Sequence, residues 1–159
     1  MPNVRLVPMT QEQYVAYRST SDEGYAQDIA SSGSMSLEDA RAKSAADFAR
    51  LLPDGLATEN ERFWTAYDAE TDAEVGMIWV HYEARSEGLT AFGYDFQVHE
   101  QLRRHGYGRA IMTATEDQLR DQGVVSVGLN VFGDNLGARS LYEQMGFEVT
   151  SVQMRKRLA

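Results

Sequence analysis

The sequence contains no cysteine, only three histidines and only three prolines among its 159 residues. The lack of cysteine excludes a disulfide framework, a thiolate metal site and a cysteine nucleophile. So few histidines also predict no histidine-based metal centre. No apolar run approaches the roughly 20 residues of a transmembrane helix, and the first ten residues lack the basic and apolar segments of a signal peptide. These absences predict a cytoplasmic protein with no metal and no membrane partner.

Lysine is scarce as well. It occurs only at Lys43 and Lys156, so 13 of the 15 basic residues are arginine, and 24 acidic residues leave a net charge of −9. Nucleic-acid binding requires a basic face, so this charge disfavours a nucleic-acid partner, even one bound through the arginines between 103 and 109. The same charge permits a cationic substrate.

The composition that remains is that of a globular chain, with 43% hydrophobic and 25% charged residues. The length suits one domain over residues 1–159 and is enough to bury a core. A strand is predicted over 4–7, and Thr10 with Gln13 is typical of a capped helix start. Gly24 and the segment 31–34 interrupt this region before a second helix, which begins at Ser36 and ends at Pro53. Strands over 63–68 and 75–82 then flank a polar hairpin loop.

The second half alternates strands with helices. Residues 89–98 show strict alternation, which predicts that Phe92, Tyr94, Phe96 and Val98 share one side of a strand. A helix over 106–122 ends at Gly123, a strand follows over 124–132, and a short helix capped by Asp134 or Asn135 runs to about residue 145. The strand–helix–strand unit predicts a parallel pair. Residues 147–158 are predicted to form one or two final strands.

The first informative motif joins the end of strand 89–98 to the next helix. It reads Arg103-x-x-Gly106-x-Gly108, with further basic residues between and after. A helix N-terminus exposes unpaired N–H donors, and glycine lets an anion approach them, so the motif predicts a phosphate cradle. An ordinary helix start with a solvated basic face is the alternative. A Walker A loop is excluded because no Gly-Lys-Ser/Thr is present, and Ile111 stands where a dinucleotide fingerprint needs its third glycine.

The second motif lies on the short helix. Asn135, Ala138 and Tyr142 share one face of that helix by their spacing. A small residue between two polar ones suits a flat ligand along the face. A tyrosine packed in the core with its hydroxyl at the rim is the alternative reading of Tyr142.

Together, the two motifs and the order of elements over residues 89–158 resemble the GNAT family of N-acetyltransferases. The resemblance implies an α/β fold with a mixed, mostly antiparallel sheet flanked by helices and a splayed parallel strand pair at the CoA site. It implies transfer of an acetyl group from acetyl-CoA, the co-substrate, to a primary amine of a small molecule or peptide by direct attack. Residues 1–88 would form the acceptor side. A CoA-binding sensor without transfer activity is the alternative.

The resemblance also assigns roles. Pyrophosphate would bind the turn, the pantetheine arm would pair with the backbone of Phe96 and Val98 where the parallel strands separate after Val98, and Tyr142 would be the catalytic acid at the sulfur. Asn135 would contact the arm and Ala138 would leave room for it. The residues implied for the pyrophosphate turn are Arg103, Arg104, His105, Gly106, Tyr107, Gly108 and Arg109.

No general base is identified. Some family members carry a carboxylate six positions before the residue equivalent to Val98, and this chain has Phe92 there. Strand parity predicts that Asp95 faces the opposite way, and His81 is expected to be a packed histidine. Several aromatic residues could hold a cationic amine or be ordinary core residues: Tyr14, Tyr17, Tyr25, Trp64, Tyr82 and Tyr94. The protein is expected to be a monomer or a homodimer, since the final strands could pair between subunits.

Overall fold

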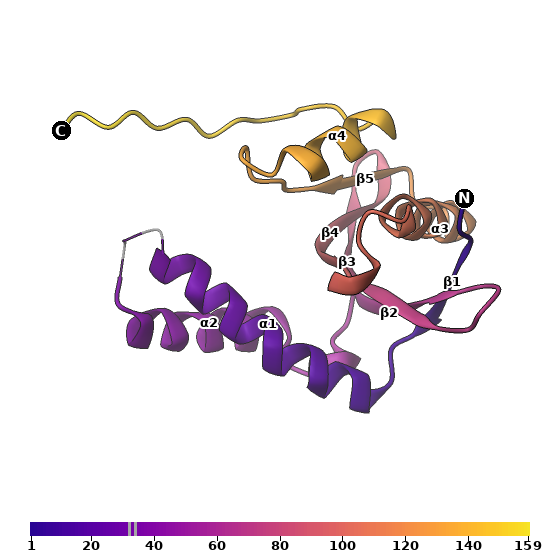
Figure 1. The fold of residues 1–159 in the computed structure, drawn as a ribbon, viewed down its shortest axis with the longest axis horizontal. Coiled ribbons are helices and arrows are strands. Elements are labelled where there is room, and N and C mark those ends of the chain that lie inside the picture. Colours follow the sequence, from indigo (N-terminus) through magenta and orange to yellow (C-terminus); the bar gives the residue numbers. More distant parts are fainter. Residues whose placement is uncertain (32, 34) are drawn as a thin grey trace.

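A computed structural model describes residues 1–31, 33 and 35–159. Five strands and four α-helices, with two short 3₁₀ helices, follow one another in these described ranges (Figure 1). In chain order the elements are β1 (Val4–Pro8), α1 (Gln11–Ser31), α2 (Leu37–Leu51), η1 (Gly55–Ala57), β2 (Glu61–Asp68), β3 (Glu74–Arg85), β4 (Gly88–Val98), η2 (Glu100–Leu102), α3 (Tyr107–Asp121), β5 (Ser126–Leu129) and α4 (Leu136–Gln144).

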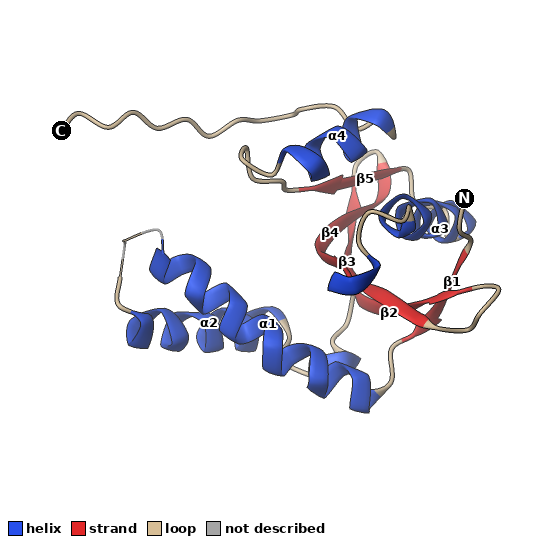
Figure 2. Ribbon diagram, in the orientation of Figure 1, coloured by secondary structure: helices blue, strands red, loops and turns tan. Residues whose placement is uncertain are grey.

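The strands form one mixed sheet in the order β1-β2-β3-β4-β5, which confirms the predicted fold class. The first four strands pair antiparallel, and β4 pairs parallel with β5 across α3. This parallel pair is the predicted strand–helix–strand unit. Because the pair lies at the end of the sheet, β5 forms an edge (Figure 2).

Helices cover both faces of the sheet. On one face α1 and α2 pack against β2 and β3, where Tyr17 and Phe48 meet Phe63 and Trp79. On the other face α3 inserts Ile111 among a cluster that includes Ile78, Val80, Ala91, Met112 and Leu119. Each described helix is too short or too polar to cross a bilayer.

Local sequence signals explain where the first two helices begin. The Gln13 N–H donates to Thr10 Oγ1 at 3.1 Å and the Thr10 N–H donates to Gln13 Oε1 at 3.0 Å, a reciprocal capping box. Ser36 caps α2 by accepting from the Asp39 N–H at 3.1 Å. The predicted break at Gly24 is wrong, because α1 continues through it to Ser31. Of the predicted loop 31–34, Ser32 and Ser34 lie outside the described residues.

The predicted strict alternation of β4 is wrong, and the reason is a bulge at Tyr94. Trp79 of β3 pairs with Asp95 and Val80 pairs with Gly93, so one residue of β4 has no partner. Before the bulge, Leu89 and Ala91 face the α3 side of the sheet; after it, Phe96 and Val98 do. The bulge therefore places Asp95 on the same face as Phe92, contrary to the predicted parity.

The end of the chain also departs from the prediction. The strand predicted over 124–132 is reduced to Ser126–Leu129, and its pairing with β4 ends at Gly93 with Leu129. The two strands therefore separate after Gly93 and not after Val98, and the free edge of β4 includes residues 94–98. The one or two strands predicted over 147–158 are not formed. The described residues from Phe147 onward contain no strand; residues 147–153 still lie beside β5 and α4, and the end of the chain extends away from the body (Figure 1).

Candidate active site

A hollow of about 240 Å³ lies where β4 and β5 separate. Four of the residues assigned from the sequence line it: Phe96 from β4, and Asn135, Ala138 and Tyr142 from α4 and its cap. Asp95 lines the same hollow, although strand parity predicted that it would point elsewhere. The bulge at Tyr94 is the missed feature, and nothing in the alternating pattern of β4 signals it.

Tyr142 presents a phenol to this hollow. Its ring packs edge-on against Phe147 at 5.5 Å between centroids, which fixes the side chain. Burial, and secondarily the negative charge of Asp95, raises the pKa of Tyr142 above its usual value of 10. The phenol therefore stays protonated at neutral pH and can donate a proton or a hydrogen bond.

Asp95 is held by three donors. Its Oδ2 accepts from the Tyr17 hydroxyl at 2.6 Å and from Gln97 Nε2 at 3.0 Å, and its Oδ1 accepts from the Phe96 N–H at 2.9 Å. Burial, reinforced by this carboxylate, raises the pKa of Tyr17 well above the ordinary tyrosine range. Tyr17 is therefore a permanent donor that orients Asp95.

The β4 backbone is the predicted partner of the pantetheine arm. In the structure, two of its polar groups already have hydrogen-bond partners. The Phe96 N–H is bonded to Asp95, and the Val98 carbonyl accepts from Arg103 Nε at 3.2 Å. A ligand strand along this edge would therefore exchange these contacts for its own.

The predicted cradle follows β4 through η2 and ends at the start of α3. Arg104 and Gly106 both adopt left-handed backbone conformations, with φ of 68° and 87°. The first backbone bond of α3 runs from the Ala110 N–H to the Gly106 carbonyl at 3.1 Å. In the described part of the chain, the N–H groups of residues 104–109 reach no protein acceptor, so this turn offers the unpaired donors that an anion needs.

The side chains around the turn contact different parts of the protein. The Tyr107 hydroxyl donates to Asp68 Oδ2 at 2.6 Å and so ties the start of α3 to the β2–β3 hairpin, a structural contact. The Tyr107 hydroxyl, with the Glu70 and Thr71 N–H groups, lowers the pKa of Asp68. Arg109 reaches across to Gln144 of α4 at 2.7 Å. His105 Nδ1 lies 2.8 Å from the Arg103 carbonyl, which closes the turn.

The aromatic residues predicted as a cation site do not gather. Tyr14, Tyr17, Trp64 and Tyr82 are buried on two different faces of the sheet, and Tyr25 lies at the α1–α2 contact. Tyr94 alone reaches solvent near the hollow, at 42% exposure, and packs on Trp79 at 4.8 Å between centroids. Most of the set is therefore ordinary core.

His81 is a packed histidine as expected, and it marks a buried carboxylate. Its Nδ1 lies 2.7 Å from Glu61 Oε1, and the Trp79 indole donates to Glu61 Oε2 at 2.8 Å. Glu61 is only 5% exposed, and these two contacts offset the cost of burying its carboxylate.

His99 contacts Glu74 at the surface, and Glu100 lies in η2. Within the described ranges no group of three potential ligands is suited to a metal ion.

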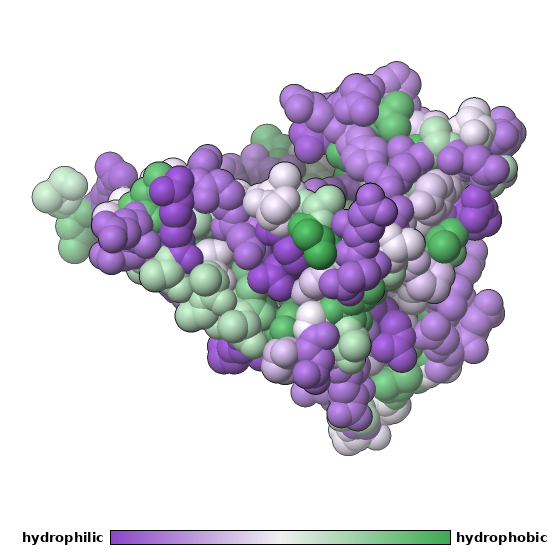
Figure 3. All heavy atoms as spheres, turned by 90° about the horizontal axis from the view of Figure 1, so that it is seen from below, coloured by the Kyte–Doolittle hydropathy of each residue, from purple (hydrophilic) through white to green (hydrophobic). Residues whose placement is uncertain are grey.

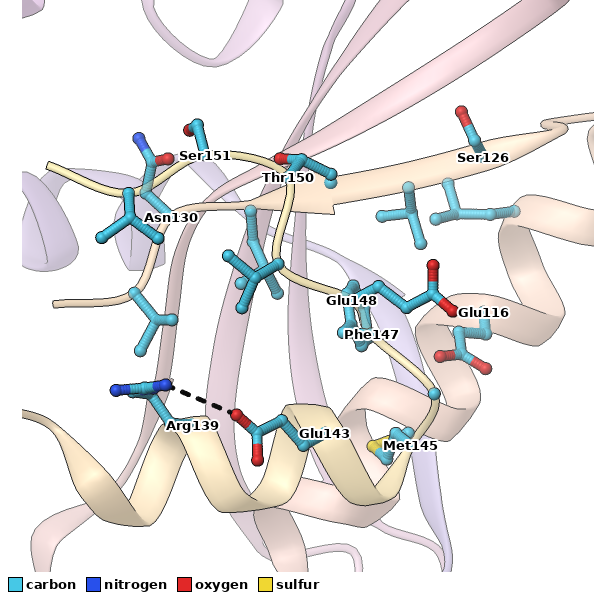
Figure 4. A pocket seen from close by; sticks show the side chains of 18 of the residues that line it. Glu116, Ser126, Asn130, Arg139, Glu143, Met145, Phe147, Glu148, Thr150 and Ser151 are labelled. Atoms are coloured by element: carbon cyan, nitrogen blue, oxygen red, sulfur yellow. Dashed lines mark ion pairs between the residues drawn. The ribbon is translucent and has the colours of Figure 1, made fainter. Parts of the chain in front are cut away.

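A larger hollow, of about 790 Å³, lies on the outer side of β5 (Figure 4). Its walls are β5, α4 and residues 149–153, and an Arg139–Glu143 ion pair at 3.6 Å spans its floor. None of the assigned site residues lines it. The smaller hollow is therefore the candidate active site despite its size.

The face that carries α1 and α2 is mostly hydrophilic, with scattered apolar side chains (Figure 3).

A mixed sheet whose parallel strands separate beside an open helix N-terminus is the architecture that the resemblance to an acetyltransferase family implied. Residues 28–147 match the model of the Acetyltransferase (GNAT) family. The chain therefore belongs to the GNAT family of acetyltransferases, which confirms the resemblance seen in the sequence.

Relatives agree with this assignment. The uncharacterized N-acetyltransferase YycN of Bacillus subtilis (strain 168) is 36% identical over 98% of this chain and 99% of its own length. Its crystal structure superposes with a TM-score of 0.89 at 35% identity, over 99% of both chains. The uncharacterized N-acetyltransferase YdgE of the same organism is 28% identical over 96% of this chain and 97% of its own length.

Proposed function

We propose that the protein transfers an acetyl group from acetyl-CoA to a primary amine, by direct attack of the amine on the thioester. The observation that carries this proposal is the meeting of Asp95 and Tyr142 in one hollow, beside the free edge of β4. A carboxylate and a protonated phenol suit amine acetylation, since one can take a proton from the amine and the other can give one to the leaving sulfur.

The cradle and the strand edge would bind the donor. The unpaired N–H groups of residues 104–109, with Arg103 and Arg104 exposed beside them, would hold the pyrophosphate. The free edge of β4 would pair with the pantetheine arm through Phe96 and Val98. The Asn135 side-chain oxygen already caps α4 by accepting from the Ala138 N–H at 3.2 Å. We therefore assign Asn135 a contact through its free amide N–H₂, and Ala138 the space beside it.

In the reaction, the amine nitrogen forms a bond to the acetyl carbon while the carbon–sulfur bond breaks. Tyr142 would give its proton, or a hydrogen bond, to the departing sulfur. Asp95 would hold the incoming ammonium and take one proton from it, directly or through water, so that the neutral amine attacks. The second proton, which the nitrogen loses as the amide forms, would return through water to the Tyr142 phenolate. Holding both reactants in one hollow supplies much of the rate.

The first test is binding. In a thermal melt, acetyl-CoA at about 100 times its dissociation constant adds roughly 2.7 kcal/mol of stability, which raises the melting temperature by about 5–10 °C for a domain of this size. NAD tests whether any pyrophosphate suffices, and dephospho-CoA tests the 3′-phosphate. The expected result is a shift with acetyl-CoA and none with NAD. No shift at millimolar acetyl-CoA would overturn the proposal.

The second test is transfer. Because the chain contains no cysteine, a thiol reagent detects released CoA with no background from the protein itself. Release should require both acetyl-CoA and an amine from a panel of small amines and peptides, and it should fail when the amine is N-methylated to a tertiary amine. Tight acetyl-CoA binding without release for any amine would favour a CoA-binding sensor instead.

A further inference from the structure

The turn that forms the predicted cradle depends on contacts from outside it for its shape. Arg104 and Gly106 adopt left-handed conformations, with φ of 68° and 87°, and a residue with a side chain rarely adopts this region. Within the described ranges, the N–H groups of residues 104–109 reach no protein acceptor. Donors in such a turn bind an anion well when they are already held in place, because ordering them on binding costs affinity.

The hairpin that joins β2 to β3 contacts both ends of this segment. At the far end, the Tyr107 hydroxyl donates to Asp68 Oδ2 at 2.6 Å. At the near end, the His99 N–H donates to the Val75 carbonyl at 2.9 Å, and His99 Nε2 lies 2.8 Å from Glu74 Oε2. The cradle lies between His99 and Tyr107 in the sequence, so one hairpin holds the chain on either side of it.

Asp68 is itself fixed in the hairpin. It is buried, and its Oδ1 accepts from the Glu70 N–H at 2.8 Å and from the Thr71 N–H at 3.0 Å. Its own N–H donates to the Ala73 carbonyl at 2.8 Å. One carboxylate oxygen therefore shapes the hairpin while the other holds the start of α3. A hydrogen bond from a hydroxyl to a carboxylate is short and stronger than one between neutral groups.

The first residues of the chain support the turn at a third point. A Cβ at Gly106 would lie 3.2 Å from Pro2 Cδ, so Pro2 packs directly against the turn. The next residue, Asn3, is tied to the same hairpin, because its carbonyl accepts from the Ala69 N–H at 2.9 Å. The hairpin is therefore linked to the two ends of the cradle segment and, through Pro2, to its middle.

We propose that the β2–β3 hairpin is a brace for the donor site, and that Asp68 and Glu74 are positioning residues for acetyl-CoA. They would act through Tyr107 and His99 and would not touch the ligand. The brace would keep the N–H donors of residues 104–109 aligned before the pyrophosphate arrives. This inference rests on the proposed function in one respect, the binding of acetyl-CoA at the turn.

A positioning role at the pyrophosphate predicts a specific kinetic pattern. The pyrophosphate and the acetyl carbon lie at opposite ends of the pantetheine arm, so contacts at the turn do not change as the thioester reacts. Weakening such contacts raises the KM for acetyl-CoA and leaves kcat unchanged. The KM for the amine should not change either. A merely structural defect would lower the amount of folded enzyme and would not raise the KM for one substrate alone.

The test compares two tyrosines that each bond α3 through one hydroxyl and pack in the same core cluster. Tyr107→Phe removes the bond to Asp68 at the start of the helix. Tyr82→Phe, the matched control, removes a bond to Gln122 at the other end of α3. Calorimetry should show about 10-fold weaker acetyl-CoA binding for Tyr107→Phe, as expected for the loss of a bond to a charged acceptor. Tyr82→Phe should bind like the wild type.

Further variants test the carboxylate and the other end of the segment. Asp68→Asn keeps an oxygen for the hairpin N–H groups, and its double variant with Tyr107→Phe should bind about as weakly as Tyr107→Phe alone, because both changes break one contact. His99→Ala removes the surface contact with Glu74. It should weaken binding by about 2- to 5-fold, and its effect should add to that of Tyr107→Phe.

NMR relaxation of the ligand-free protein separates the brace from the proposed function. The amide order parameters of residues 104–109 should be about 0.85 in the wild type, the value of rigid backbone, and should fall in Tyr107→Phe but not in Tyr82→Phe. If Tyr107→Phe binds acetyl-CoA like the wild type, or no more weakly than Tyr82→Phe, the brace is overturned and the proposed function stands. A wild type that binds no acetyl-CoA would overturn the proposed function, and the order parameters would still decide whether the hairpin holds the turn.

Discussion

The Tyr17 hydroxyl donates a 2.6 Å hydrogen bond to the Asp95 carboxylate, which joins the middle of α1 to the bulged part of β4. This contact brings an element of the N-terminal half to the hollow that holds Tyr142. It also gives the hollow a carboxylate with a fixed orientation. In our proposal the reactive amine lies between these two halves of the chain.

We expect Asp95→Asn to lower kcat for amine acetylation by about 10²-fold or more, the usual loss when a general base is removed. The dissociation constant of acetyl-CoA should not change, because the cradle is untouched. A rise in the KM of the amine would show that the carboxylate also binds the ammonium.

Tyr17→Phe is the matched control for that prediction. It keeps the ring in the core beside Phe63, at 6.0 Å between centroids, and removes only the hydroxyl. The carboxylate remains, so kcat should fall by less than about 10-fold, as expected for the loss of one hydrogen bond. Full activity of Asp95→Asn would show that Asp95 takes no proton.

Tyr142→Phe is expected to lower kcat by about 10²-fold while acetyl-CoA binds as before, because only the proton donor is removed. The pH profile gives a second readout. Burial raises the pKa of Tyr142 above 10, so the acid form persists up to and beyond that pH. The wild-type rate should therefore rise as the amine loses its proton and show no fall below pH 10. A descending limb near pH 8 that disappears in Tyr142→Phe would show that the pKa of Tyr142 is lowered and not raised, whereas full activity of Tyr142→Phe would contradict its role as the acid.

The sequence was sufficient for features encoded by short-range chemistry. The capping box at Thr10 and Gln13, the cap at Ser36, and the glycine turn before α3 each depend on a few neighbouring residues. The parallel pairing of β4 with β5 followed from the order of elements. The family resemblance implied that the two strands separate beside that turn, although the separation begins at Gly93 and not after Val98.

Two features depended on contacts that no local pattern encodes. The bulge at Tyr94 is set by how β4 pairs with β3, and the apolar alternation of residues 92–98 continues across it. It places Asp95 in the hollow, contrary to the direction that strand parity predicted for its side chain. Residues 147–158 have the alternation of a strand but no described partner strand, and alternation alone cannot supply one.

Gly108 offers a test of the donor site that leaves the fold intact. A Cβ at this position would lie 3.5 Å from Leu141 and 3.6 Å from Phe96, which are ordinary contacts in the gap between β4 and α4. We therefore expect Gly108→Ala to keep the melting temperature. It should weaken acetyl-CoA binding by about 10-fold or more, since one extra methyl in a fitted site has an effect of that order.

Gly137→Ala is the control, because Gly137 lies in the first turn of α4 with nothing within 4 Å of its Cβ position. Its acetyl-CoA affinity, measured by calorimetry, should equal that of the wild type. Equal affinity for the Gly108→Ala variant would show that the donor does not pass between Phe96 and Leu141.

Alanine substitutions at Gly76 and Gly24 are expected to change the free energy of unfolding in opposite directions. At Gly76, in β3, a Cβ would overlap the Gln97 carbonyl oxygen of β4 and lie 3.1 Å from Ile111 of α3. Backbone on one side and a buried side chain on the other leave it no room to move, so Gly76→Ala should lower the free energy of unfolding by about 1–3 kcal/mol or more. At Gly24, inside α1, nothing lies within 4 Å. Gly24→Ala should raise the free energy of unfolding by about 0.5–1 kcal/mol through helix propensity. Urea denaturation of both variants measures the two changes, and a Gly76→Ala protein as stable as the wild type would mean that β3 and β4 do not approach so closely at this point.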